Sequence, residues 1–188
     1  MRKSVATTMA LAALALCGAG CGNDAGNPES KLTPAEASTP IAGSPAPLAA
    51  LRRQGGELLP GGTAAFRARV ERLRGHPIVV NKWASWCGPC RFEFPHFQAV
   101  ADELGDRVAF LGVDSNDDRA SAEQFLGELP LPYPSYLDPK SRIAELVGAP
   151  KAFPATAFFD AKGELVHVRQ GVYPDEAALR ADVERWAR

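Results

Sequence analysis

The sequence is poor in cysteine and has no long apolar run beyond its first twenty residues. Its 188 residues include four cysteines: Cys17, Cys21, Cys87 and Cys90. Only the last two lie beyond the N-terminal region. The folded part therefore has no second pair that could act as an internal resolving couple or a structural staple. After residue 20, no stretch is long and apolar enough to cross a bilayer.

The sequence also lacks an excess of charge of either sign. Its net charge is −1 and its basic residues form no long run, so we expect no nucleic-acid partner. No G-x-G-x-x-G motif follows a predicted strand, which argues against a bound nucleotide. The length allows one domain with a substantial core and some additional chain.

The N-terminal segment, residues 1–20, has the pattern of a secretory signal. Two basic residues precede an apolar run over residues 5–16 that is too short for a membrane-spanning helix. Residues 18–21, Gly-Ala-Gly-Cys, resemble a bacterial lipobox, whose cysteine is lipidated after cleavage. Gly18 departs from the usual leucine, and plain secretory cleavage is the alternative. An unlipidated Cys21 would leave an odd thiol outside the cell, so we expect Cys21 to carry a lipid.

Residues 21–56 are rich in Ala, Pro, Ser, Gly and Asn, and they contain few aliphatic side chains. Such a composition buries too little apolar surface to offset the entropy of ordering the chain. It predicts a flexible, disordered tether between the lipid anchor and the folded domain.

The remaining residues, 57–188, alternate helical and strand patterns, as expected for an α/β domain. A strand, a helix and a strand in succession form a right-handed parallel unit. With a hairpin and a closing helix after it, the pattern predicts a mixed central sheet flanked by helices. The expected elements are a helix over 63–74, a buried strand over 78–84, a helix over 91–104, a buried strand over 108–113, a helix from 117 or 118 to 129, a helix that begins at Asp138-Pro139 and stops at Gly148, a hairpin of 155–160 and 164–170, and a helix over 175–187.

The stretch that organises this domain is the cysteine pair, Cys87 and Cys90, between a predicted strand and a predicted helix. The free N–H groups and the dipole at a helix N-terminus favour negative charge. Cys87 should therefore ionise more readily than a free cysteine and act as the nucleophile. Cys90 can then attack a mixed disulfide formed at Cys87, so that the pair cycles between dithiol and disulfide.

The block over residues 86–90, Trp-Cys-Gly-Pro-Cys, resembles the active site of thioredoxin. The wider context resembles the extracytoplasmic thioredoxin-like proteins of the TlpA/ResA type. The likeness covers residues 56–188 and also rests on Asn81, on Glu93 with Pro95, and on residues 153–156, Phe-Pro-Ala-Thr. It implies the thioredoxin fold.

The resemblance assigns further roles at the site. It implies a cis peptide at Phe153–Pro154, with that loop facing the cysteines and offering backbone to the substrate. It implies that Glu93 tunes the proton transfers of the pair; an exposed helix glutamate is the alternative. The residue at position 81 replaces the buried aspartate of cytoplasmic thioredoxins by an asparagine, and Lys82 stands where an aromatic residue is common, with its amine expected to reach solvent.

The residues around the cysteines are expected to contact the substrate. Trp86 lies next to Cys87 and shields it. Gly88 allows a partner's backbone to come close, and Pro89 suits the first turn of a helix. A Gly-Pro pair between the cysteines is typical of the reducing members of the superfamily.

The resemblance implies an extracytoplasmic thiol–disulfide oxidoreductase that reduces exported proteins, such as apocytochrome c. Its partners would be proteins with disulfides or thiols and a membrane thiol reductase as electron donor. It would need no cofactor or metal, since the redox-active pair supplies the electrons.

Two other functions stay open. A copper-handling lipoprotein could use the same thiol pair, although structural zinc would need four ligands. A thiol peroxidase is disfavoured, since Ala84 and Val80 occupy the positions where peroxiredoxins carry threonine and proline.

Overall fold

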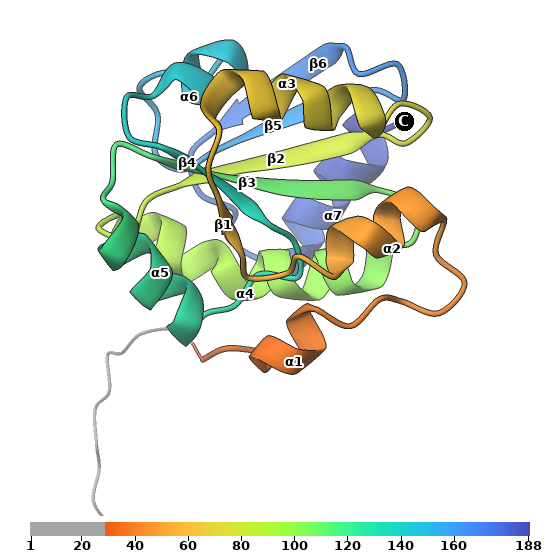
Figure 1. Cartoon of the computed structure of the whole chain (residues 1–188), viewed down its shortest axis with the longest axis horizontal. Coiled ribbons are helices and arrows are strands. Elements are labelled where there is room, and N and C mark those ends of the chain that lie inside the picture. The colour runs from red at the N-terminus through yellow and green to blue at the C-terminus, as the bar shows by residue number, and fades with distance from the viewer. Residues whose placement is uncertain (1–28) are drawn as a thin grey trace, which may run out of the picture.

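A six-stranded mixed sheet forms the centre of the protein (Figure 1). The computed structural model describes residues 29–188. The strands are β1 (Leu58–Leu59), β2 (Ile78–Trp83), β3 (Ala109–Ser115), β4 (Ser135–Asp138), β5 (Ala155–Phe159) and β6 (Leu165–Gln170). They lie in the order β1-β4-β3-β2-β5-β6. β2 pairs in parallel with β3 and antiparallel with β5, and β5 forms an antiparallel hairpin with β6. The predicted parallel unit and hairpin are confirmed.

Helices cover both faces of the sheet (Figure 1). On one face lie α3 (Gly62–Arg72) and α6 (Arg142–Leu146), and on the other lie α4 (Gly88–Leu104), α5 (Arg119–Glu128) and α7 (Glu176–Trp186). Two short helices precede β1, namely α1 (Pro34–Ala37) and α2 (Ala46–Arg52). Within residues 29–188, no helix is both long and apolar enough to span a bilayer.

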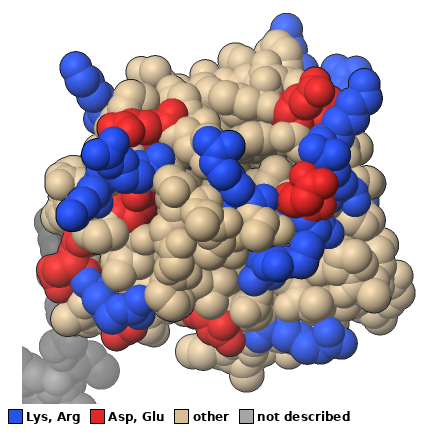
Figure 2. Space-filling model, turned by 45° about the horizontal axis from the view of Figure 1, so that its top comes forward, with Lys and Arg blue, Asp and Glu red and all other residues tan. Residues whose placement is uncertain are grey.

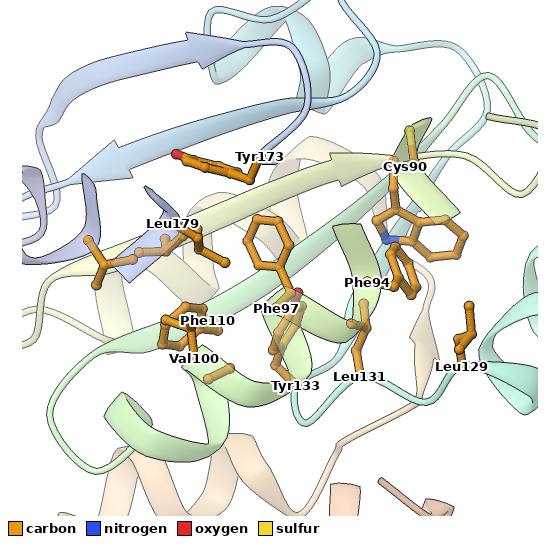
Figure 3. Close-up of a cluster of buried hydrophobic side chains, with 14 of the residues drawn as sticks. Cys90, Phe94, Phe97, Val100, Phe110, Leu129, Leu131, Tyr133, Tyr173 and Leu179 are labelled. Atoms are coloured by element: carbon orange, nitrogen blue, oxygen red, sulfur yellow. The ribbon is translucent and has the colours of Figure 1, made fainter. Parts of the chain in front are cut away.

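The strand β2 supplies both layers of the core, because successive side chains of a strand point to opposite faces. Val79 and Trp83 belong to the cluster under α4, α5 and α7, whereas Val80 belongs to the cluster under α3 and α6. The first cluster is rich in aromatic side chains, and Figure 3 shows Cys90 at one end of it, close to Phe94. The redox pair is therefore attached to the larger part of the core.

The surface carries charges of both signs. On the face that Figure 2 presents, lysine and arginine side chains are interspersed with aspartate and glutamate, in keeping with the net charge of −1.

Three helix starts differ from the prediction. α4 begins at Gly88, three residues before the predicted start at residue 91. α3 begins at Gly62 with Gly61 as its N-cap, instead of at Thr63. α6 begins at Arg142, four residues after the expected cap Asp138. The carboxylate of Asp138 nevertheless accepts hydrogen bonds from the N–H groups of Arg142 and Ala144, so it caps this helix across an intervening turn.

The segment predicted to be a disordered tether, residues 21–56, differs from that prediction from residue 29 onward. It forms α1 and α2, and its side chains Ala37, Leu48 and Leu51 are buried. The Arg52 guanidinium donates to the carboxylate of Asp102 on α4 at 2.6 Å. The few aliphatic residues of this segment thus lie on the side that packs against the domain. The predicted signal over residues 1–20 and the lipidation site Cys21 lie outside the described residues.

Replacing Leu51 by alanine measures whether this segment belongs to the folded unit. Leu51 is only 3% exposed, and removing such a side chain leaves a cavity, so we expect the free energy of unfolding to fall by about 2–5 kcal/mol. Chemical denaturation of the full chain provides the measurement. Leu165→Ala is the control, since Leu165 is 42% exposed and should change stability by less than about 0.5 kcal/mol. Equally small changes in the free energy of unfolding for both variants would instead support the prediction of a disordered tether.

Candidate active site

The two cysteines lie at the N-terminus of α4, where β2 leads into the helix. Cys87 is the N-cap residue, and its Sγ accepts a hydrogen bond from the N–H of Cys90 at 3.2 Å. The two residues form a disulfide with their Cα atoms 5.3 Å apart. Cys87 keeps 4% exposure whereas Cys90 is fully buried. The predicted position of Cys87 at the helix N-terminus is confirmed, and Cys87 is the more exposed of the two residues.

The loop between β2 and α4 is fixed by the loop that follows β3. The N–H of Ser85 donates to the Asp117 carboxylate at 2.5 Å, and the indole N–H of Trp86 donates to the carbonyl of Asn116 at 2.9 Å. Trp86 remains 56% exposed beside Cys87. The sequence analysis missed Asn116 and Asp117, although their position directly after a buried strand next to β2 could have indicated them.

The residues between the cysteines are free of crowding. A Cβ built at Gly88 would meet no atom within 4 Å, so packing within residues 29–188 does not demand glycine there. Pro89 lies in the first turn of α4, as predicted. The first turn thus presents an open surface next to Cys87.

The loop before β5 approaches the same site. The Phe153–Pro154 peptide is cis, as the resemblance implies. The Phe153 ring lies 4.8 Å from the Trp86 ring, centre to centre. The carbonyl of Pro154 accepts a hydrogen bond from Gly171 at 2.9 Å, which ties this loop to the end of β6. Trp86 and Phe153 therefore form one aromatic pair beside the disulfide.

Glu93 lies one turn after Cys90 and is fully buried. Its Oε2 accepts a hydrogen bond from the Tyr173 N–H at 3.1 Å, while its Oε1 has no partner in the described residues. Burial raises the pKa of Glu93 to about 8, although the Tyr173 hydrogen bond and the Arg169 charge oppose this shift. The exposed-glutamate alternative is wrong.

Asn81 occupies the middle of β2 and is fully buried. Its amide donates to the hydroxyl of Tyr133 at 3.4 Å. An asparagine cannot accept a proton from a thiol, and Glu93 is the buried carboxyl that α4 brings into the core.

A second buried carboxyl, Asp114 on β3, was missed by the sequence analysis. It lies opposite Trp83 in the sheet register and is fully buried. Burial, followed by the charge of Asp117, raises the pKa of Asp114 to about 9. Asp114 therefore favours the protonated form at neutral pH, close to Asp117 of the loop after β3.

The prediction for Lys82 is wrong. Its amine does not reach solvent, because the side chain is fully buried.

Within residues 29–188, no group of three or more His, Cys, Asp or Glu side chains is arranged to hold a metal ion.

The Redoxin family model matches residues 42–184, three-quarters of the chain. The chain belongs to the Redoxin family. The matched region of this Redoxin chain begins inside the segment that composition predicted to be a tether, in agreement with the packing of α2. The predicted fold class, a mixed central sheet flanked by helices, is confirmed.

The chain is also similar to individual thiol:disulfide interchange proteins and thioredoxins. The Redoxin chain is 36% identical over 117 residues to the thiol:disulfide interchange protein DsbE of Pseudomonas fluorescens biotype C, covering 59% of this chain and 60% of that protein. A putative DsbE structure from Chlorobium tepidum matches with a TM-score of 0.55 and 27% identity, covering 60% of this chain and 80% of that one. An exposed lipoprotein thioredoxin from Streptococcus pneumoniae matches with a TM-score of 0.52 and 25% identity, covering 62% and 89%. The chain spans about three-fifths of the length of the curated relative.

The buried carboxyl of Glu93 predicts a pH dependence of stability. Its pKa is raised from 4.5 to about 8 in the folded state, so the folded protein keeps a proton that the unfolded chain releases in this range. Its contribution to stability is fully present below about pH 4.5 and is lost as the pH rises through about 8. Relative to Glu93→Gln, the free energy of unfolding of the oxidised wild type should therefore fall across this window.

The exposed Glu164 of the hairpin turn provides the control, and Glu164→Gln should run parallel to the wild type. Parallel curves for Glu93→Gln as well would show that Glu93 is ionised in the fold.

Proposed function

We propose that this Redoxin-family protein is an extracytoplasmic thiol–disulfide oxidoreductase that acts on other proteins through Cys87 and Cys90. The observation that carries the proposal is the disulfide at the N-terminus of α4, in which the residue Cys87 is 4% exposed and Cys90 is fully buried. The similarity to a thiol:disulfide interchange protein and to a lipoprotein thioredoxin supports it.

The reducing cycle follows from this arrangement. In the dithiol form, the Cys87 thiolate attacks one sulfur of a partner disulfide; the partner's S–S bond breaks and its other sulfur leaves as a thiolate. Cys90 then attacks the Cys87 sulfur and releases the second partner thiol. Two electrons have moved to the partner, and the Cys87–Cys90 disulfide has formed. The helix N-terminus lowers the energy of the Cys87 thiolate at the start.

Glu93 is the acid–base group of the cycle in this proposal. Cys90 must lose its proton before it attacks, and it is buried away from water. A carboxyl with a pKa of about 8 on the same helix matches a thiol, whose ordinary pKa is near 8.5. The unpartnered Oε1 of Glu93 leaves one oxygen available for this proton.

The docking surface for a partner consists of Trp86, Gly88, Pro89, Phe153 and Pro154. The exposed indole of Trp86 and the open space at Gly88 leave room for a polypeptide against Cys87. Two further apolar side chains are exposed, Phe92 in the second turn of α4 and Val172 after Gly171, whose N–H donates to the Pro154 carbonyl. An apolar rim around a reactive sulfur suits an unfolded or extended protein chain better than a small polar thiol.

The direction of electron flow and the partners are proposed by resemblance. The Gly88-Pro89 pair favours reduction of partner disulfides, with exported proteins such as apocytochrome c as substrates. A membrane thiol reductase would return the electrons. No cofactor enters the cycle.

The cysteine roles predict different trapping behaviour. With Cys90→Ser, the mixed disulfide at Cys87 cannot be resolved, so we expect covalent partner complexes on non-reducing gels. Cys87→Ser should trap few or none, because Cys90 is buried. The double variant sets the background. Equal trapping by both single variants would refute the assignment of Cys87 as the nucleophile.

The anchor is a separate proposal, in which the signal over residues 1–20 is removed and a lipid on Cys21 holds the domain at the outer face of the membrane. The pneumococcal structure with which the chain shares its fold is described as an exposed lipoprotein. Cys21→Ala should move the protein from the membrane fraction to the soluble fraction of its native host. A wild-type protein that is already soluble and unlipidated would contradict this proposal.

A further inference from the structure

The side chain of Lys82 is a fully buried amine in the middle of the sheet. Lys82 lies on β2, between Val113 of β3 and Ala155 of β5 in the register. Burying an ammonium group costs free energy, and an apolar side chain of similar length is often at least as stabilising at such a position. The position therefore calls for an explanation beyond the stability of the core.

The amine is directed at the loop that leads to Pro154. Its Nζ donates a hydrogen bond of 2.8 Å to the carbonyl of Ala152 and lies 3.5 Å from the centre of the Phe153 ring. An ammonium over an aromatic face is attracted by the ring quadrupole, more strongly when both groups are shielded from water. Ala152 and Phe153 lie outside the helices and strands. The two contacts with Lys82 therefore attach this irregular segment to β2.

The same loop is half of the aromatic pair beside the disulfide. Phe153 contacts Lys82 and also lies 4.8 Å from Trp86, whose indole N–H is fixed by Asn116. A continuous series of contacts thus runs from the buried amine, through the Phe153 ring, to the exposed residue next to Cys87.

We propose that Lys82 is a positioning residue, whose ammonium group holds Ala152 and Phe153 in place and so sets the docking surface for a partner polypeptide between Trp86 and Pro154. The inference rests on the proposed thiol–disulfide exchange and deepens it. Lys82 touches neither sulfur in this role. It affects reactions in which a chain must lie along that loop, and it leaves the exchange chemistry itself unchanged.

The charge of Lys82 is adjustable near neutral pH. Burial lowers the pKa of Lys82 to about 8, while the charge of Asp138 opposes this shift. Asp138 on β4 is itself held by Ser115 of β3 and by the N–H groups of Arg142 and Ala144 at the start of α6. The flanking residues of β3 and β5 are apolar. The ammonium contacts should therefore weaken as the pH rises through about 8.

The test compares a protein disulfide with a small one. Reduced full-length wild type, Lys82→Met and Lys82→Arg are each reacted in a single turnover with insulin and with glutathione disulfide, near pH 7. Lys162→Met is the matched control, since Lys162 is exposed in the hairpin turn. We expect Lys82→Met to lower the rate constant for insulin about tenfold. The rate constant for glutathione disulfide, and the equilibrium constant of the Cys87–Cys90 pair with glutathione, should stay within about twofold of the wild type. Lys162→Met should match the wild type.

The pH profile gives a second readout that a merely structural role would not move. Both reactions use Cys87 and Cys90, so the pH dependence that comes from these two thiols cancels in the ratio of the insulin to the glutathione disulfide rate constant. For the wild type, this ratio should fall as the pH rises through about 8. It should be independent of pH for Lys82→Met. Lys82→Arg keeps its charge and should keep the ratio above about pH 9.

Three outcomes would overturn the inference. The first is an unchanged insulin rate in Lys82→Met, and the second is an equal loss for both substrates, which indicates general damage to the site. The third is a wild-type protein whose ratio of the insulin to the glutathione disulfide rate constant does not depend on pH. This measurement uses the wild type alone and so does not require any variant to fold. A wild type that reduces neither substrate would instead overturn the proposed function, and the inference with it.

Discussion

The junction between β2 and α4 is the constraint on which the rest of the site depends. A parallel strand at the centre of the sheet ends, and a helix begins at Gly88 with Cys87 as its cap. This junction places one sulfur at the positive end of a helix and the other one turn inside, beside the aromatic side chains under α4. The two thiols therefore differ in exposure before any other residue acts on them. The loop after β3, through Asn116 and Asp117, keeps the junction in that position.

Buried ionisable groups surround this junction on several elements. Glu93 lies on α4, Asp114 on β3 and Lys82 on β2, and all three are fully buried. Burial moves the pKa of each toward the neutral form, to about 8, 9 and 8 respectively. Charged side chains are rarely fully buried in natural cores. Here Glu93 shares α4 with the cysteines, Asp114 pairs with Trp83 at the end of β2, and Lys82 contacts the loop before Pro154. The site thus has a cost to the fold that an apolar core would avoid.

The sequence predicted the elements whose pattern is long and regular, and it missed those defined by tertiary contacts. The apolar runs of β2 and β3, and the stripe of Phe94, Phe97, Ala101 and Leu104 on α4, were sufficient to place the parallel unit. β1 and β4 have too few residues to form a pattern. Composition misjudged residues 29–56, because their few apolar side chains, such as Leu48 and Leu51, are buried against the domain and not among themselves. The prolines of this segment do not prevent its helices either. Pro34 and Pro47 lie in the first turns of α1 and α2, where a missing N–H costs nothing.

At the site, sequence reasoning found the residues that act through their own chemistry, whereas Lys82 and Asp114 depend on what surrounds them. A lysine in a strand is most simply explained as an exposed residue, and only the approach of Ala152 and Phe153 gives its amine a buried partner. The packing of α1 and α2 also alters the anchoring argument. If Cys21 carries a lipid, residues 29–56 do not act as a flexible tether, because α1 and α2 pack against the domain. The distance between the lipid and the domain is then limited by the eight residues from Cys21 to Glu29. A fully extended stretch of that length spans about 30 Å at most. Membrane partners then have to come to the domain, because the domain has little freedom to reach them.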